Sequence, residues 1–379
     1  MVTLQFRPVV RFRCAGPGGR AAAPEELDVT IPVMRPVGPS LDRIGARLRT
    51  VWDAGRFANF GPQEESLRSR LAVLLGVPAN TVMTAANATL ALTGAVAVLG
   101  GRRWSVPAFT FPASVAAVGA AGADPLLSDV NPDSWSLTTP EEPVDGALVV
   151  APFGAAPDLM AWKDSGRVVH DAAASLGEMP DLSGLPDTQV VVFSLHATKV
   201  LGIGEGALAV FGSPESARDF REWTNFGFSG TRESSRQGVN AKLSELHAVV
   251  AHAALDGWES ERAEWREARR LMTAALDSAG IELFSASRSG VNPYTIARFS
   301  DLSVRDAAHA ALERAGVETR AWWSRGCHRM PAYSALATRP FPGAEHAADV
   351  SLGLPMFRGL GADEADRIAA ALVAVGRGG

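Results

Sequence analysis

Short apolar segments of strand length recur through the middle of this 379-residue chain, and helix-length segments separate most of them. They read TVMTA, RWSVPA, DPLLSDV, ALVVAPF, RVVHDAA, QVVVFSL and GALAVF, between residues 81 and 211. Such alternation is typical of an open sheet of largely parallel strands that helices cover. The pattern therefore predicts an α/β fold.

The pattern changes after about residue 250. A long charged helix is expected over residues 255–280, a strand within residues 292–300 and a further helix over residues 303–316. We therefore expect a large α/β domain over residues 31–250 and a smaller α+β domain over residues 251–379.

The first 30 residues form a separate segment, because MVTLQFRPVVRFRCAGPGGR is basic and ends in a Gly-rich turn. The segment lacks the long apolar core of a signal peptide. We expect a non-catalytic leader, with an edge strand and linker as the alternative. Beyond it, Ser40 is expected to cap a helix that stops at Gly55.

Composition excludes several classes of function. The net charge of −5 carries no basic excess for binding a nucleic-acid backbone. Cys14 and Cys327 form neither a metal-ligand spacing nor a disulfide framework, which suits a reducing cytoplasm. No apolar run reaches the roughly 18 residues that span a bilayer. We therefore expect a soluble, cytoplasmic protein without a metal site.

Three turns after apolar segments carry side chains suited to chemistry. Lys199 follows QVVVFSL, and its amine can form a Schiff base with pyridoxal phosphate and then move a proton. Asp171 ends RVVHD, where a carboxylate can keep a pyridine nitrogen protonated. Residues 87–89, Asn-Ala-Thr, precede a helix whose free N–H groups suit a phosphate. The ordinary alternatives are a solvated lysine and two helix caps.

Two other catalytic arrangements fit the sequence less well. The glycines of GIGEG, at 202–206, precede a strand instead of a phosphate-binding helix, which argues against a dinucleotide fingerprint. Ser194 and His196 stand only two residues apart, and no Gly-x-Ser-x-Gly turn is present. A catalytic triad with Asp171 is therefore disfavoured.

Seven motifs occur in a family-like order: NFGP (59–62), NATLAL (87–92), VPAFTFPASVAAVGAAGADPLLSDV (106–130), HDAAASLG (170–177), FSLHATK with GEGALAVF (193–211), NFGFSG (225–230) and GVNAKLSELHA (238–248). From about residue 31 to its end, the chain resembles the DegT/StrS family of nucleotide-sugar aminotransferases. Four of the motifs are most similar to the branch that aminates C4 of dTDP-4-keto-6-deoxyglucose. The resemblance implies the aspartate-aminotransferase-like (type I) fold of pyridoxal-phosphate enzymes and a homodimer with shared active sites.

The same resemblance assigns roles to individual residues. Lys199 corresponds to the lysine that carries the cofactor, and Asp171 to the partner of its pyridine nitrogen. The positions that match phosphate contacts are Ala88, Thr89, Ser194 and, for the phosphate of the neighbouring subunit's cofactor, Asn240. Phe111 stands where the family stacks an aromatic ring on the cofactor, although a core phenylalanine is the ordinary alternative.

One position departs from the family pattern. Ala174 stands three residues after Asp171, where the family usually has a glutamine or histidine that contacts the cofactor's phenolic oxygen or the substrate. The change leaves cofactor binding plausible and leaves the identity of the substrate open. A related branch replaces the cofactor lysine by histidine and dehydrates sugars, and Lys199 argues against that branch.

Candidates for substrate binding come from two segments. Arg320 and His328 lie in RAWWSRGCHRMPAY, which resembles the family's substrate-facing loop, and a salt-bridged or helix-facing role is the alternative. Loop 229–237, with Arg232 and Arg236, can reach the other subunit's site or remain solvated.

The resemblance implies a pyridoxal-phosphate-dependent aminotransferase that moves an amino group from L-glutamate to a nucleotide-linked keto-deoxy sugar. The branch points to a dTDP-4-keto-6-deoxyhexose, in deoxyaminosugar or antibiotic biosynthesis. Two alternatives stay open: a non-sugar ketone such as an aminocyclitol precursor, and a non-catalytic sensor or scaffold. The intact pair of Lys199 and Asp171 disfavours the scaffold.

Overall fold

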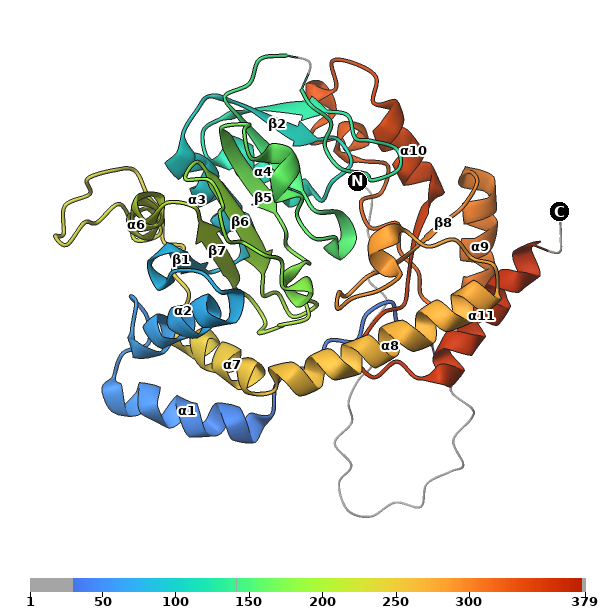
Figure 1. Ribbon diagram of the computed structural model, residues 1–379, viewed down its shortest axis with the longest axis horizontal. Helices are drawn as coiled ribbons and strands as arrows, with labels where there is room; N and C mark the ends of the chain where they lie inside the picture. The colour runs from blue at the N-terminus through green and yellow to red at the C-terminus, as the bar shows by residue number, and fades with distance from the viewer. Residues whose placement is uncertain (1–29, 141, 377–379) are drawn as a thin grey trace, which may run out of the picture.

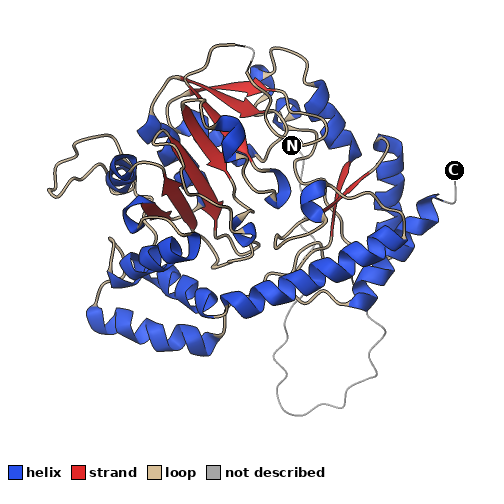
Figure 2. Cartoon of the chain, in the orientation of Figure 1, coloured by secondary structure: helices blue, strands red, loops and turns tan. Residues whose placement is uncertain are grey.

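The computed structural model describes residues 30–140 and 142–376, which contain one large and one small β-sheet (Figures 1 and 2). The large sheet has the order β1-β7-β6-β5-β4-β2-β3. Its strands are β1 (Val82–Ala85), β2 (Arg103–Pro107), β3 (Asp124–Ser128), β4 (Gly146–Val150), β5 (Arg167–Asp171), β6 (Gln189–Ser194) and β7 (Ala207–Phe211). Strands β2 to β6 pair in parallel, whereas β7 pairs antiparallel with β6 and β1. This arrangement confirms the α/β fold with a mixed, mostly parallel sheet.

The central strands are apolar throughout because both faces of the sheet are buried. In β6, Val190 and Val192 belong to one core cluster, while Val191 and Phe193 belong to the other. The first cluster includes side chains of α3 (Ala88–Leu99), α4 (Pro112–Ala120) and α6 (Pro214–Trp223). The second includes side chains of α2 (Pro62–Leu75) and α7 (Glu245–Asp256). The sheet is thus the middle layer between helices, as Figure 2 shows.

The helix ends only partly follow the predicted caps. Helix α1 (Leu41–Ala54) ends at Gly55, which adopts a left-handed φ of 63°, as expected. Ser40 occupies the predicted N-cap position of this helix, but its side chain makes no capping hydrogen bond. At the start of α3, the cap is Asn87, whose Oδ1 accepts a hydrogen bond from the backbone N–H of Leu90 at 2.9 Å. Thr89 therefore lies inside the helix and does not cap it.

The small sheet pairs β8 (Thr295–Arg298) antiparallel with β9 (Ser351–Leu354). The helices around it are α8 (Trp258–Ser278), α9 (Leu302–Arg314), α10 (Pro342–Val350) and α11 (Ala362–Gly376). The short helix α5 (Leu159–Trp162) belongs instead to the large-sheet region. The single helix expected over residues 255–280 is divided at Gly257, between α7 and α8. The side-chain ends of Arg43 and Glu261 lie close to Gly257 at this break. The predicted domain boundary at residue 250 falls within α7 and remains a prediction.

One apolar core continues from the large sheet to the small one. It contains Phe193 of β6, Met272 of α8, Leu352 of β9 and Ile368 of α11, each at most 3% exposed. Helix α8 links the two regions along the lower edge of the molecule (Figure 1). The relative position of the two sheets is therefore fixed by buried side chains as well as by the connecting chain.

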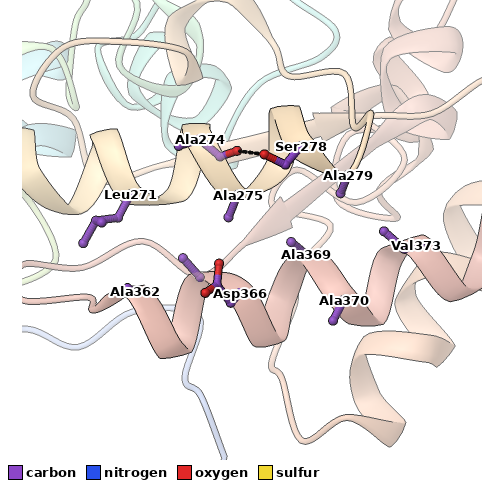
Figure 3. Close-up of a pocket in the computed structure, with 11 residues that line it drawn as sticks. Leu271, Ala274, Ala275, Ser278, Ala279, Ala362, Asp366, Ala369, Ala370 and Val373 are labelled. Atoms are coloured by element: carbon purple, nitrogen blue, oxygen red, sulfur yellow. Dashed lines mark hydrogen bonds between the residues drawn. The ribbon is translucent and has the colours of Figure 1, made fainter.

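Helices α8 and α11 face each other through small side chains. Figure 3 shows the groove between them, of about 360 Å³, with Ala274 and Ala275 on one side and Ala369 and Ala370 on the other. Asp366 is the one ionisable side chain in its lining among the described residues. The groove therefore lacks the cluster of acid, base and cationic groups that catalysis needs.

The structure describes little of the N-terminal extension, but it does describe Cys327 and the longest helices. The extension predicted over residues 1–30, with Cys14, lies outside the described residues except for Thr30. Cys327 is buried, and burial raises the pKa of its thiol to about 12, so it is chemically quiet. No helix within 30–140 or 142–376 is both long enough and apolar enough to cross a bilayer.

Gly94 should be required for packing α3 against α6. A Cβ at this position would lie 2.5 Å from the ring of Phe220 and 2.6 Å from that of Trp223, both of which are buried. We expect Gly94→Ala to lower the free energy of unfolding by about 2 kcal/mol, because overpacking forces rigid rings apart. The matched control is Gly119→Ala in α4, where nothing lies within 4 Å. Urea unfolding of both variants checks this; equal stabilities would contradict it.

Candidate active site

A cavity of about 640 Å³ opens where the parallel strands of the large sheet end. Val150, Asp171 and Ser194, the last residues of β4, β5 and β6, all line it. Ligands of open α/β sheets bind outside the carboxyl ends of strands, so this is the expected place for a site. Of the residues with predicted roles, those lining the cavity are Ala88, Thr89, Phe111, Asp171, Ser194, Lys199 and Arg320.

Lys199 lies on a tight turn after β6. Its backbone N–H donates to the carbonyl oxygen of His196 at 2.8 Å, and Gly202 allows the turn because a Cβ there would lie 2.5 Å from the carbonyl oxygen of Ala197. The Nζ atom donates a hydrogen bond to the hydroxyl of Tyr294 at 2.8 Å. The turn thus holds a half-buried amine in the cavity, with its hydrogen-bond partner in the small-sheet region.

Asp171 presents a buried carboxylate, 7% exposed, to the same cavity. Its Oδ2 accepts a hydrogen bond from Ser114 Oγ at 2.8 Å, and its Oδ1 accepts one from the N–H of Ala173 at 3.2 Å. Burial raises the pKa of Asp171, against the opposing effects of these hydrogen bonds and of the charge on Lys199. No α-helix begins at Asp171, so the predicted alternative of a helix cap is not what the structure shows.

The start of α3 offers backbone donors to the cavity. The first N–H groups of a helix have no acceptor within the helix, and the Asn87 side chain takes up only that of Leu90. Within the described residues no acceptor is recorded for the N–H groups of Ala88 and Thr89. The hydroxyl of Ser194 lines the same cavity and accepts a hydrogen bond from the N–H of His196 at 3.2 Å. These groups form a cradle for an anion.

Aromatic rings form much of the remaining wall. Phe111, immediately before α4, is 58% exposed in the single chain, which distinguishes it from a core phenylalanine. Phe153 stacks on Trp323 with ring centres 4.0 Å apart, and Trp322 meets Tyr294 edge to face at 5.0 Å. Trp322 and Trp323 belong to the segment RAWWSRGCHRMPAY, but no sequence pattern pointed to a role for them. The same is true of Phe153 and Tyr294.

Arg320 is the one arginine among the described residues that line the cavity. Its backbone pairs with Gly353 of β9 through hydrogen bonds of 2.8 and 2.9 Å, and its guanidinium carbon lies 5.0 Å from the centre of the Trp322 ring. The small sheet therefore fixes the backbone of Arg320 beside the cavity. Its side chain supplies a positive charge there.

Two residues with predicted roles do not line the cavity. His328 is 5% exposed, packs against Phe341 and lies 3.7 Å from Glu345; burial lowers its pKa. Asn240 is exposed and forms an isolated bridge with Asn225 on the surface of the single chain. The cavity of one chain thus gives no support to a substrate role for His328, and the role predicted for Asn240 needs a second subunit.

Other sequence alternatives can also be compared with the structure. Nδ1 of His196 lies 2.9 Å from the hydroxyl of Thr198, whereas Ser194 contacts only the backbone of His196. This arrangement gives no Ser–His dyad. Arg236 pairs with Asp219 at 2.8 Å, and that contact raises its pKa, so it has a structural role within its own chain.

The residues present fit pyridoxal phosphate. A primary amine, a buried carboxylate and an anion cradle line one cavity, which matches the aldehyde, ring nitrogen and phosphate of that cofactor in kind. No cation lies within ion-pair distance of Asp171 in the described part of the chain, although a buried carboxylate needs a positive partner. A protonated pyridine would supply that partner.

Comparison with known proteins agrees with this chemistry. The chain is 27% identical over 350 residues, 87% of its length and 93% of the relative's, to the UDP-N-acetyl-3-dehydro-α-D-glucosamine 3-aminotransferase of Acidithiobacillus ferrooxidans. It is 28% identical over 335 residues, 82% and 86% of the two lengths, to the dTDP-3-amino-3,4,6-trideoxy-α-D-glucose transaminase of Streptomyces venezuelae. A crystal structure of DesI with its TDP-sugar product is similar with a TM-score of 0.82 and 29% identity, covering 94% of this chain and 95% of DesI.

The family itself follows from a match to most of the chain. Residues 41–373 match the model of the DegT/DnrJ/EryC1/StrS aminotransferases, which confirms the predicted relationship. A crystal structure of S. venezuelae DesV in complex with a ketimine intermediate is also similar, with a TM-score of 0.76 and 26% identity, covering 88% of this chain and 94% of DesV. This chain therefore belongs to the DegT/DnrJ/EryC1/StrS aminotransferase family and is a pyridoxal-phosphate-dependent aminotransferase.

Proposed function

We propose that this aminotransferase moves an amino group from L-glutamate to the keto carbon of a nucleotide-linked sugar, a dTDP-4-keto-6-deoxyhexose. The observation that carries the proposal is the meeting of Lys199, Asp171 and the start of α3 in one cavity. A nucleotide-linked sugar is supported by the names of the relatives, which include dTDP- and UDP-linked sugars. Reaction at C4 is supported by the four motifs similar to the branch that aminates C4 and by a relative named as a dTDP-4-amino-4,6-dideoxy-D-glucose transaminase. Cytoplasmic location and a place in deoxyaminosugar or antibiotic biosynthesis belong to the same proposal.

The cofactor residues have the following roles in this proposal. Pyridoxal phosphate, when bound, would supply an aldehyde that takes the amino group from the donor and passes it to the acceptor, and a protonated ring that acts as the electron sink. Lys199 binds the cofactor covalently and, once its amine is free, moves a proton to and from the reacting carbon. Asp171 keeps the ring nitrogen protonated, because its buried carboxylate needs a cation beside it. Phe111 offers an exposed ring for stacking.

The phosphate contacts are assigned to backbone and hydroxyl donors. Ala88 and Thr89 supply N–H groups at the positive end of α3, and Ser194 supplies a hydroxyl. These groups take no part in proton transfer, and their role is to bind and orient the phosphate. Their position at the ends of β6 and the start of α3 is rigid, which keeps Lys199 and Asp171 in a fixed relation to the phosphate.

Substrate binding is assigned to two further residues of the cavity lining, Arg320 and Ala174. Arg320 adds the positive charge suited to an anionic substrate group, a carboxylate or a diphosphate. Ala174 is small and lines the cavity, so space remains where the family usually has a polar side chain. The proposal retains His328 only as a residue of the surrounding core.

We further propose a homodimer that completes both sites. Asn240 is exposed and is proposed to reach the phosphate bound by the second subunit. Phe226 and Val239 are exposed apolar side chains, and burial of such surface stabilises a subunit interface. The regions 31–250 and 251–379 are proposed as the large and small domains of each subunit.

A substrate panel tests the function. The holoenzyme is mixed with L-glutamate and one acceptor at a time: dTDP-4-keto-6-deoxyglucose, a UDP-linked 3-keto sugar or a non-sugar cyclic ketone. We expect 2-oxoglutarate to form with the dTDP sugar at a kcat/KM at least about tenfold above the others, since differences of this size arise from a few contacts. A preference for the cyclic ketone would overturn the sugar assignment. Failure of glutamate to alter the cofactor's absorbance would overturn the donor assignment.

A further inference from the structure

Tyr294 is the only described residue whose side chain makes a recorded hydrogen bond to the amine of Lys199. The Nζ–Oη distance is 2.8 Å, and Nζ also lies 5.0 Å from the centre of the phenol ring. The two residues are 95 positions apart, with Lys199 on the turn after β6 and Tyr294 just before β8. The contact therefore joins the large-sheet region to the small-sheet region at the reacting atom.

The ring of Tyr294 is held on two sides. It meets Phe153 edge to face at 5.8 Å and Trp322 edge to face at 5.0 Å. Phe153 adopts a left-handed φ of 51°, and Trp322 packs on Gly353, where a Cβ would lie 2.2 Å from the indole nitrogen. Both neighbours are thus themselves fixed by the backbone, so the hydroxyl of Tyr294 has a defined position.

The backbone of Tyr294 is fixed by a buried arginine. Arg269 is 2% exposed and donates to oxygen atoms of Ser287, Asn292, Thr295 and the carbonyl of Tyr294. No acidic group lies within ion-pair distance of it among the described residues, and burial lowers its pKa to about 10. A buried guanidinium used in this way holds the loop before β8 in one conformation.

The phenol suits an amine that changes its protonation state. When Lys199 is an ammonium, it donates a hydrogen bond to the phenolic oxygen of Tyr294. When Lys199 is a neutral amine, the phenol O–H donates a hydrogen bond to the nitrogen lone pair. The phenol is neutral in both arrangements, so Tyr294 adds no charge of its own beside Asp171. The same pair therefore stays hydrogen-bonded in both states, which keeps the amine directed into the cavity.

We propose that Tyr294 is a positioning residue for the reaction: it orients the Lys199 amine and governs how readily that amine takes up and releases its proton. The inference rests on the role proposed above for Lys199, but not on the identity of the sugar. The proposal assigns this effect on the Lys199 amine to the hydroxyl group of Tyr294 and not to its aromatic ring.

The composition of the chain makes this testable without substrate. The chain has three lysines, Lys163, Lys199 and Lys242, and two tyrosines, Tyr294 and Tyr333. Reductive ¹³C-methylation of the full chain, prepared without cofactor, therefore gives three lysine side-chain signals, and loss of one in Lys199→Arg assigns Lys199. The pH profile of that signal is then compared in wild type, Tyr294→Phe and the matched control Tyr333→Phe. The Tyr333 hydroxyl lies 3.4 Å from the carbonyl oxygen of Pro112, outside the cavity lining.

We expect the Lys199 profile to move to lower pH in Tyr294→Phe and to stay unchanged in Tyr333→Phe. The hydrogen bond from the charged ammonium is stronger than the one to the neutral amine, so its loss destabilises the ammonium more. In the holoenzyme, kcat of Tyr294→Phe should fall about 30-fold, the size of one hydrogen bond to a charged group, with KM changed less than about threefold. Superimposable profiles for Tyr294→Phe and wild type would overturn the proposal, as would an unchanged kcat. An inactive wild type with a shifted profile in Tyr294→Phe would instead count against the choice of substrate.

Discussion

Lys199→Ala should reduce kcat by at least about 10⁴-fold while the protein still folds. The substitution removes both the covalent attachment of the cofactor and the base that moves the proton, and residues that act in both ways give losses of this size. The side chain is only half buried and its single recorded hydrogen bond is to Tyr294, so the fold loses little. Turnover and the far-ultraviolet circular dichroism spectrum provide the measurements.

The small number of lysines supplies a matched control for that experiment. Lys163 is exposed and follows α5, away from the cavity. Lys163→Ala should retain full activity and the cofactor's absorbance. If Lys199→Ala kept turnover within tenfold of wild type, Lys199 would not be the cofactor lysine, and the assignment of the whole site would fail.

Asp171→Asn should reduce kcat about 10³-fold, a size typical of losing one preorganised electrostatic partner in an active site. Asparagine keeps the shape and the hydrogen bond with Ser114, but it cannot hold a proton on a pyridine nitrogen. The control is Ser114→Ala, which removes the 2.8 Å hydrogen bond to the carboxylate and leaves its charge. That variant should lose only about tenfold. A similar loss in both would assign the effect of Asp171→Asn to geometry instead of charge.

Asp171→Asn should lose activity without losing stability. Burial raises the pKa of Asp171, so the folded protein without cofactor binds this proton more tightly than the unfolded chain does. The protonated carboxyl contributes stability below the pKa of the unfolded chain, and this contribution is lost as the pH rises through the pKa of the folded protein. At neutral pH the buried, ionised carboxylate therefore destabilises the folded state. We therefore expect the Tm of cofactor-free Asp171→Asn at pH 7 to equal or exceed that of wild type. A fall of several degrees would show that the carboxylate stabilises the fold.

The parts of the site that sequence reasoning found are those encoded locally. Lys199, Asp171 and the start of α3 each follow a strand, and a parallel sheet brings the carboxyl ends of its strands to one edge. The burial of both faces of β6 likewise appears in the sequence as a continuous apolar run. Local pattern was therefore enough for the fold class and for placing these residues at one edge of the sheet, whereas their cofactor roles came from the family resemblance and stay a prediction.

The parts that sequence reasoning missed depend on long-range packing. Tyr294 reaches Lys199 only because Arg269 and the small sheet hold a loop against the large-sheet region, and no local spacing encodes that contact. His328 shares a segment with Arg320, but the chain turns at Gly326, with φ 86°, and places the imidazole against Phe341. Neighbours in sequence thus face different environments.

The apolar core that joins the two sheets has a consequence for engineering. Because Phe193, Met272, Leu352 and Ile368 share one cluster, removal of either region would expose apolar surface of the other. Neither half should therefore be a self-sufficient folding unit. Grafting the C-terminal region of a relative would require both sides of this cluster to change together, so variants with new acceptor preference are better sought by single substitutions around the cavity than by modular exchange.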